Sequence, residues 1–364
     1  DNIATNDLIR VSYRASVEPD PANVSGQNKD NSVTLSSTSP SLTESLDDAS
    51  FTVVEPLLTF AKDIVSVPVV DLEAGDTITY QVSIGHYQDL TDPDPDSTAT
   101  AYDVVFSDTV PSSLRIDPGS IQVTGTSGLT PNDFQVTDFG LRISADFDLP
   151  LGQFLVLEYT ARIQDSVVVG ETIVNDARLA WSSMSGDVAG ERDYALADTE
   201  TAVAGGLLEA RKSVLDTSVA ETPGAELTIV EVVTYEVQLD VFEGTTLDVV
   251  LTDVLPAELQ YLPGTVRVVA PNMDTGYVDE ATSVAYDPGT RTLRIDLDYV
   301  LNPADDAYNR TLFVTYDAVV MDEAANASGQ GKDNQATAQA RNLPHSQASA
   351  TVNIVEPLLT IDKT

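Results

Sequence analysis

Apolar and polar residues alternate with a period of two along much of this chain. The segments 77–84, 154–161, 234–241 and 292–299 show the alternation most clearly, and they are rich in Val, Ile, Thr and Tyr. Such a pattern is typical of strands with one buried and one exposed face. Turn sequences such as Asp-Pro-Gly and Leu-Pro-Gly separate these segments, and no stretch has a sustained helical period. The pattern predicts an all-β fold of many short strands.

The sequence also repeats itself at intervals of about 150 residues, which is the mark of tandem domains. VEPLLTFAKD at 54–63 returns as VEPLLTIDKT at 355–364, and a looser copy, GLLEARKS, begins at Gly206. VVFSDTVPSSLRIDPGS from Val104 is matched by VVLTDVLPAELQYLPGT from Val249. Strand-rich units of this length favour β-sandwiches, so we expect tandem Ig-like sandwich domains.

The order of the repeats predicts two whole domains and two partial ones. We expect whole domains over 56–205 and 206–355, the second half of a domain over 1–55, and the first strand of a further domain over 356–364. Half a sandwich leaves sheet faces and edges uncovered. We therefore expect a window cut from a longer repetitive protein, or else a subunit whose ends are completed by neighbouring copies.

A lysine, an aspartate and an asparagine each extend an apolar stripe at a strand end in both whole units, because alternate strand residues share a face. The two sets are Lys62, Asp108 and Asn175, and then Lys212, Asp253 and Asn334. An apolar site lowers the pKa of a lysine and raises that of an aspartate. A neutral amine can then attack the asparagine carboxamide while the protonated acid polarises it. The trio predicts an intramolecular Lys–Asn isopeptide bond, formed once per domain with loss of ammonia.

Ordinary structural roles explain each of these residues taken singly. A lysine at a strand end can extend to water, an aspartate in a D-x-x-P corner can accept bonds from backbone amides, and asparagine is a common turn residue. Their occurrence together, in phase and twice over, favours the cross-link.

The run from AGDTITYQVSI (74–84) through AYDVVFSDTVPSSLRIDPGS to IVNDARL (173–179) resembles the Ig-like repeat domains of bacterial and archaeal surface proteins. It is similar both to the conserved-repeat module of large cell-surface proteins and to the isopeptide-forming domains of fimbriae and collagen adhesins. The resemblance implies bonds from Lys62 to Asn175 and from Lys212 to Asn334, promoted by Asp108 and Asp253. It leaves Asn31 and Lys363 for partners outside this chain.

The charge and composition exclude several classes of function. The 364 residues carry 58 acidic and 18 basic side chains, a formal charge of −40, with no cysteine and two histidines. Nucleic-acid binding needs clustered Lys and Arg, and an anionic membrane surface would repel so acidic a chain. Disulfides and zinc–thiolate sites are excluded, and little remains for a zinc or triad enzyme. No apolar run approaches the roughly 20 residues of a membrane-spanning helix. We expect no enzyme, no nucleic-acid partner and no membrane insertion.

An acidic insertion at 89–103 is the one candidate for a metal site. Its aspartates, Asp89, Asp92, Asp94 and Asp96, could supply oxygen ligands to calcium. Ser97 stands where an EF-hand calcium loop needs glycine, so a solvated acidic loop is the alternative interpretation. No cofactor other than calcium is expected.

These observations together predict a structural, extracellular segment of a surface fibre, stalk or adhesin. Its partners would be neighbouring repeats of the same long chain or other copies in a filament. Two alternatives stay open at this point: a calcium- or glycan-binding adhesin module, and accessory domains of a large secreted enzyme.

Overall fold

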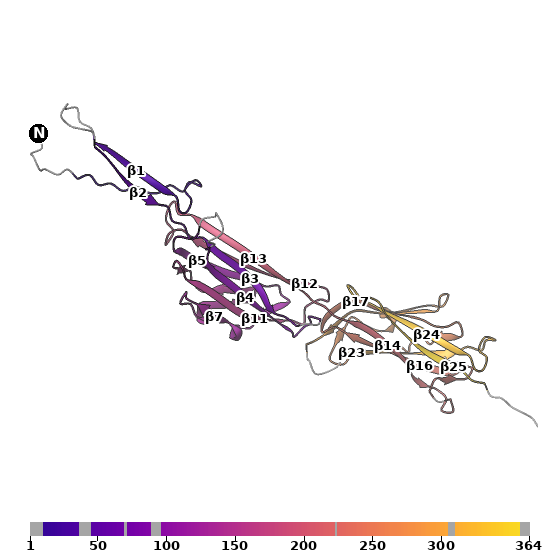
Figure 1. Ribbon diagram of the computed structural model, residues 1–364. Coiled ribbons are helices and arrows are strands. Elements are labelled where there is room, and N and C mark those ends of the chain that lie inside the picture. The colour runs from indigo at the N-terminus through magenta and orange to yellow at the C-terminus, as the bar shows by residue number, and fades with distance from the viewer. Residues whose placement is uncertain are drawn as a thin grey trace, which may run out of the picture.

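The computed structural model describes residues 10–35, 45–68, 71–88, 96–222, 224–304 and 310–356. Within these ranges the chain forms five β-sheets, one short helix, α1 (Glu280–Ser283), and two 3-10 turns. A hairpin and two sandwiches follow one another along one axis (Figure 1). The predicted all-β architecture of tandem Ig-like β-sandwiches is confirmed. In the described part of the chain, α1 and the two turns are too short to cross a membrane.

Eleven strands build the first sandwich. They are β3 (Leu58–Ser66), β4 (Thr77–His86), β5 (Ala101–Thr109), β6 (Leu114–Ile116), β7 (Gln122–Gly125), β8 (Phe134–Thr137), β9 (Gly140–Ile143), β10 (Phe147–Leu149), β11 (Phe154–Ile163), β12 (Thr172–Ser182) and β13 (Asp193–Val203). One sheet has the order β3-β4-β11-β6, with β7 also paired to β11. The other has the order β13-β12-β5-β9-β8, with β10 paired to β5.

Twelve strands build the second sandwich. They are β14 (Leu208–Thr217), β15 (Glu226–Leu227), β16 (Val232–Val241), β17 (Gly244–Val254), β18 (Leu259–Tyr261), β19 (Arg267–Val269), β20 (Asp274–Thr275), β21 (Val284–Asp287), β22 (Thr292–Asn302), β23 (Thr311–Val320), β24 (Gly331–Gln339) and β25 (Ser346–Ile354). One sheet has the order β14-β16-β23-β18, with β19 also on β23. The other has the order β15-β25-β24-β17-β22-β20, with β21 on β22.

The period-two pattern becomes the core of each sandwich. Buried and less buried residues alternate along β4 and β11, and again along β16 and β23. Tyr80 and Tyr159 stack at 5.5 Å between ring centroids in the first core, and Tyr235 and Tyr316 lie 5.6 Å apart in the second. Because these strands sit in the middle of their sheets, their inward side chains are wholly excluded from water.

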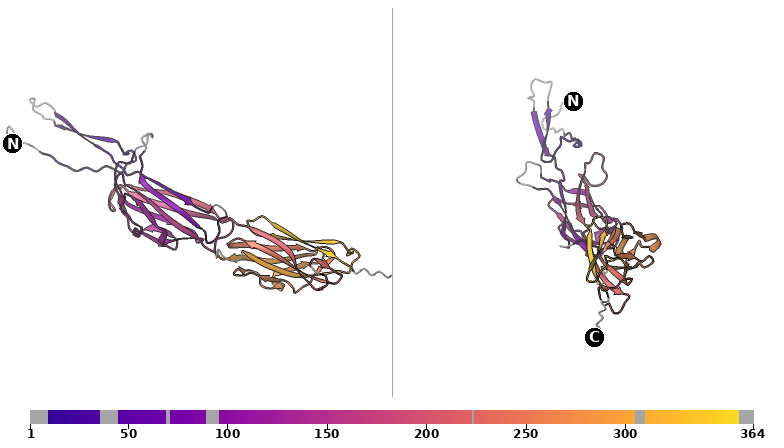
Figure 2. Two further views of the ribbon diagram at one scale, coloured as in Figure 1. Left: turned by 60° about the horizontal axis from the view of Figure 1, so that its bottom comes forward. Right: turned by 90° about the vertical axis from the view of Figure 1, so that its right-hand side faces the viewer.

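The two sandwiches lie end to end (Figure 2), and residues of one contact the other. Phe242, at the end of β16, is 1% exposed and belongs to the apolar core of the first sandwich. Backbone bonds cross the junction from Ala74 to Glu243 and from Thr245 to Val167. The junction therefore combines buried apolar surface with strand-like hydrogen bonds.

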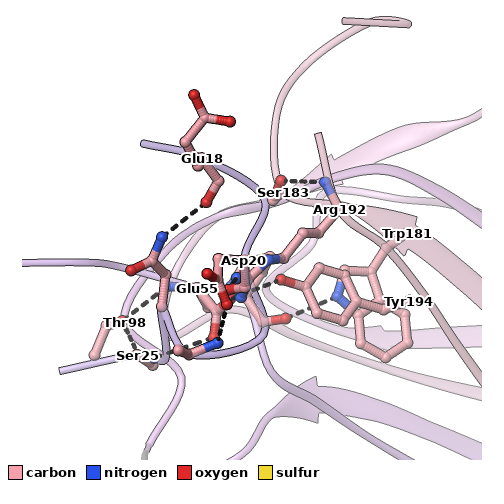
Figure 3. A network of polar contacts seen from close by, with 12 residues as sticks. Glu18, Asp20, Ser25, Glu55, Thr98, Trp181, Ser183, Arg192 and Tyr194 are labelled. Carbon is pink, nitrogen blue, oxygen red and sulfur yellow. Dashed lines mark hydrogen bonds and ion pairs between the residues drawn. The ribbon is translucent and has the colours of Figure 1, made fainter. Parts of the chain in front are cut away.

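The segment before the first sandwich forms a two-stranded hairpin, β1 (Asn28–Leu35) and β2 (Ser45–Thr52), that projects away from it (Figures 1 and 2). A network at its base joins it to the sandwich (Figure 3). Arg192 forms an ion pair with Glu55, whose carboxylate also accepts a bond of 3.1 Å from the Ser25 amide. Trp181 donates to the Pro56 carbonyl at 2.8 Å and stacks on Tyr194, so it belongs to the core. The extent of the predicted half-domain over 1–55 stays a prediction.

Candidate functional site

Each sandwich buries one lysine, one aspartate and one asparagine at the same place in its core. Lys62, Asp108 and Asn175 are 1%, 3% and 0% exposed. Asp253 and Asn334 are both 0% exposed, and the Lys212 side chain is equally inaccessible. So complete a burial of polar side chains is costly unless they pair, donate or change protonation state.

Strand register brings the aspartate and asparagine together. β5 and β12 pair with Asp108 opposite Ala177, so Asn175 lies two residues along β12 on the same face. In the second sandwich β17 and β24 pair with Asp253 opposite Ala336, which places Asn334 in the same diagonal position. These relationships follow from pairing between strands distant in sequence.

The lysine approaches from the facing sheet. Lys62 lies on β3, the edge strand, whose backbone amide at Lys62 donates to Asp198 of β13 at 2.8 Å. Lys212 has the equivalent place on β14, and the Ala210 amide, two residues before it, donates to the hydroxyl of Ser346, the first residue of β25, at 2.9 Å. These bonds tie the edges of the two sheets together beside the site, so the lysine side chain points into the core.

In the first sandwich the polar groups form one connected network. Lys62 Nζ lies 2.5 Å from Asp108 Oδ2. The Tyr159 hydroxyl donates to the same carboxylate oxygen at 2.7 Å, and Asn175 Nδ2 donates to the Tyr159 hydroxyl at 3.0 Å. The Tyr80 ring lies beside the amine, with its centroid 5.0 Å from Lys62 Nζ.

The second sandwich repeats the network. Lys212 pairs with Asp253, and its amine also lies 2.9 Å from the Tyr316 hydroxyl. That hydroxyl donates to Asp253 Oδ2 at 2.6 Å and accepts from Asn334 Nδ2 at 2.8 Å. Tyr235 takes the place of Tyr80, with its ring centroid 4.8 Å from the amine.

Burial drives both members of each lysine–aspartate pair towards the neutral form. It lowers the pKa of Lys62 and raises that of Asp108, although their mutual attraction opposes both changes. Burial likewise lowers the pKa of Lys212 to about 8 and raises that of Asp253. A neutral amine is a nucleophile and a protonated carboxyl is an acid, so the site holds the two functions that amide transfer needs.

Each site leaves two buried acceptor atoms without a hydrogen bond from any described residue. They are the second carboxylate oxygen, Oδ1 of Asp108 or Asp253, and the carboxamide oxygen, Oδ1 of Asn175 or Asn334. Such unpaired buried oxygens cost about 1–3 kcal/mol each. The arrangement is thus poorly optimised as a static polar core.

Sequence reasoning missed the tyrosines. Tyr159 and Tyr316 occupy the same position in LVLEYTAR (155–162) and LFVTYDAV (312–319), a repeated landmark of the chain. The signal was a tyrosine in phase with the buried residues of its strand. An inward tyrosine is a common core residue, so its hydroxyl contacts became visible only in three dimensions.

The other predicted cross-linking residues lie apart from these sites. Asn31 Nδ2 lies 2.5 Å from the Tyr13 hydroxyl, the same residue pair as in the sandwiches, but both residues are exposed. Lys363 lies outside the described residues. The roles assigned to these two residues stay predictions.

The acidic insertion is only partly described. Asp89, Asp92 and Asp94 lie outside the described residues, and the Asp96 carbonyl accepts a bond of 3.3 Å from the Ser25 hydroxyl. Across the described ranges, no three His, Cys, Asp or Glu side chains form a cluster suited to a metal ion. Calcium binding by this loop stays a prediction.

Comparisons with known proteins add little to these observations. No family model matches the chain, and no curated protein matches it. Solved structures that resemble it include "BspA_C_WT" (TM-score 0.28, 9% identity, 80% of this chain and 99% of that one). The collagen adhesin CNA from S. aureus resembles it with a TM-score of 0.25 and 10% identity, over 81% of this chain and 91% of that one. A putative membrane anchored protein from Corynebacterium diphtheriae has a TM-score of 0.28 and 8% identity, over 93% of this chain and 98% of that one. Likenesses this weak indicate no function for this chain.

Proposed function

We propose that each sandwich is a self-cross-linking structural domain of an extracellular fibre, stalk or adhesin. The carrying observation is the buried Lys–Asp–Tyr–Asn network, which occurs twice with the same connections. The lysine amine attacks the asparagine Cγ, a new C–N bond forms, and the original carboxamide nitrogen leaves as ammonia. The reaction happens once per site, so the role is maturation of a structural protein.

The positions of the bonds suit a mechanical function. Glu55 contacts Ser25 at one end of the first sandwich, and Ala204 lies at the other end, in the core that also holds Phe242. Tension along the rod would therefore enter through β3 and leave through β13. A bond from Lys62 to Asn175 would transfer that tension directly from β3 to β12. The roughly 110 residues between them would then lie outside the load path, because the covalent link is the shorter route.

The composition of the chain suits an exposed, repetitive structural protein. A formal charge of −40 on 364 residues keeps long β-rich chains soluble and mutually repelling. With no cysteine in the chain, an isopeptide bond would fill the stapling role that disulfides have in other extracellular proteins. We propose neighbouring repeats or other copies of the chain as its partners.

The decisive experiment is the intact mass of the purified chain. Two cross-links would make the wild-type mass lower than that calculated from its sequence by two molecules of ammonia. The Asn175→Ala variant should lie below its own calculated mass by one molecule of ammonia, since only its second sandwich can react. Asn31→Ala is the matched control, because Asn31 is exposed, and it should still lose two. A wild-type mass equal to that of the unmodified sequence would reject the proposed function.

A further inference from the structure

The tyrosine hydroxyl stands between the acid and the leaving group in both sites. In the first sandwich the Tyr159 hydroxyl is 2.7 Å from Asp108 Oδ2 and 3.0 Å from Asn175 Nδ2. In the second, the Tyr316 hydroxyl is 2.6 Å from Asp253 Oδ2 and 2.8 Å from Asn334 Nδ2. The carboxamide nitrogen, which must leave, is therefore joined to the acid through a phenol.

The direction of these bonds has a chemical consequence. An amide nitrogen is a poor leaving group until it is protonated, and general acids that supply such protons contribute about 10²–10⁴-fold in rate. The hydroxyl donates to the carboxylate in the resting arrangement and receives the amide N–H, so it is already in hydrogen-bond contact with both ends of a proton path. We propose that Tyr159 and Tyr316 are catalytic residues that relay a proton from the aspartate to the departing nitrogen; this inference rests on the proposed cross-linking function.

The steps balance without any further reactant. As Lys62 Nζ bonds to the Asn175 Cγ, the surplus proton on the amine passes to Asp108 Oδ2, 2.5 Å away. Tyr159 gives its proton to Asn175 Nδ2 as the Cγ–Nδ2 bond breaks, and it takes the proton held by Asp108. The products are the Lys–Asn amide and ammonia, and both the phenol and the carboxyl return to their starting states.

The surroundings favour a phenol that stays protonated between transfers. Burial, with the neighbouring aspartate, raises the pKa of Tyr159 and of Tyr316 well above the ordinary value of 10.0. A phenol of this kind can pass a proton on only if it receives one at the same time. This requirement is met by an aspartate whose own pKa is raised by burial.

The second tyrosine of each site does not contact the acid. Tyr80 and Tyr235 are equally buried and pack against the relay tyrosines at 5.5 and 5.6 Å, yet their hydroxyls donate no hydrogen bond to Asp108 or Asp253. Removing the oxygen from Tyr80 keeps the ring that packs against the lysine. Removing it from Tyr159 interrupts the path between acid and leaving group.

The test follows bond formation in the full chain after cell-free synthesis, with peptide mapping to read each sandwich separately. Tyr159→Phe should slow ammonia loss in the first sandwich at least tenfold, while the second sandwich of the same molecule reacts at the wild-type rate. Tyr316→Phe should give the reverse result, with the second sandwich slowed and the first reacting at the wild-type rate. Equal rates for Tyr159→Phe and wild type would overturn the relay and leave the cross-linking function standing, whereas no ammonia loss from the wild type would overturn both.

Two further measurements separate chemistry from folding. Melting of Asn175→Ala is compared with that of the double variant Tyr159→Phe, Asn175→Ala, since neither can cross-link in the first sandwich; similar melting shows that the slow rate does not arise from misfolding. Site-specific replacement of Tyr159 by a more acidic fluorinated tyrosine should then change the rate of ammonia loss in the first sandwich at a fixed pH, because the phenol holds the proton that it donates less tightly. A rate equal to that of the wild type would contradict proton relay by this hydroxyl.

Discussion

Lys62 Nζ lies 2.5 Å from Asp108 Oδ2 in the first core, and neither side chain has any surface accessible to water. A buried ion pair of this kind adds little stability, because desolvation of the charges offsets their attraction. Burial instead moves the pKa of the lysine down and that of the aspartate up, so the pair is suited to exchange a proton. The relationship is better explained by reactivity than by stability.

Replacing the acid should therefore stop the reaction without removing the nucleophile. Asp108→Asn keeps the size of the side chain but cannot accept the lysine proton, and we expect no cross-link in the first sandwich. Peptide mapping should show an unchanged cross-link in the second sandwich, whose Asp253 is intact. A first sandwich that still loses ammonia in this variant would contradict the role of the acid.

The cross-link should raise the free energy of unfolding of each sandwich. A bond from Lys62 to Asn175 encloses roughly 110 residues, and loop-closure entropy for that length gives about 4–5 kcal/mol. Asn175→Ala, which cannot cross-link, should lower the denaturant midpoint of the first sandwich correspondingly. Asn31→Ala serves as the control, since Asn31 is exposed, and its midpoint should equal that of the wild type.

Bond formation in the second sandwich should depend on pH with a maximum. The reactive form has a neutral Lys212 and a protonated Asp253, so it is lost when the pair gains a second proton and also when it gives up its last one. Because the pKa of Lys212 is lowered to about 8, the alkaline limb should lie near pH 8. Rates of ammonia loss from pH 5 to 10 check this, and a rate that rises steadily to pH 10 would contradict it.

The junction between the sandwiches should be sensitive to pH. Arg310 Nη2 lies 2.9 Å from Glu73 Oε2, and its Nε lies 3.7 Å from Glu243 Oε1, so one arginine serves two buried carboxylates from different sandwiches. Burial raises the pKa of Glu73 from the ordinary 4.5 to about 7, with Arg310 opposing and Glu243 reinforcing the change. The folded state thus holds this proton more tightly than the unfolded state does.

It follows that the contribution of Glu73 is fully present below about pH 4.5 and is lost as the pH rises through about 7. We expect a fall in the free energy of unfolding of at most about 3 kcal/mol across that window. Denaturant titrations at several pH values should show this slope in the wild type and a flatter one in Glu73→Gln. Glu209→Gln, an exposed position, should keep the wild-type slope.

The apolar part of the junction should hold the two sandwiches as one unit. Phe242 directly follows β16 of the second sandwich but is buried in the core of the first, so Phe242→Ala should cost about 3–5 kcal/mol. Small-angle scattering should also show a wider range of inter-sandwich angles. Phe139→Ala, at a residue that is 77% exposed, is the matched control and should change neither quantity.

Sequence alone determined the architecture of this protein to a large extent. Period-two alternation predicts strands because successive side chains point to opposite faces, and this relationship needs no knowledge of the partner strand. The same parity indicated that Lys62, Asp108 and Asn175 face inward, because each is in phase with apolar neighbours on its own strand. The internal repeats predicted that the second sandwich has the same strands and the same lysine, aspartate and asparagine as the first.

Only the tertiary structure decided which of these inward side chains contact one another. The diagonal placement of Asn175 beside Asp108 depends on the register between β12 and β5, strands separated by some 60 residues of chain, and the approach of Lys62 depends on how the two sheets face each other. Tyr159 has the pattern of any inward tyrosine, and only the packing of its sheet against the sheet of β5 and β12 gives its hydroxyl two polar neighbours. Parity fixes the face on which a side chain lies, whereas its contacts across the core depend on the pairing and packing of distant strands.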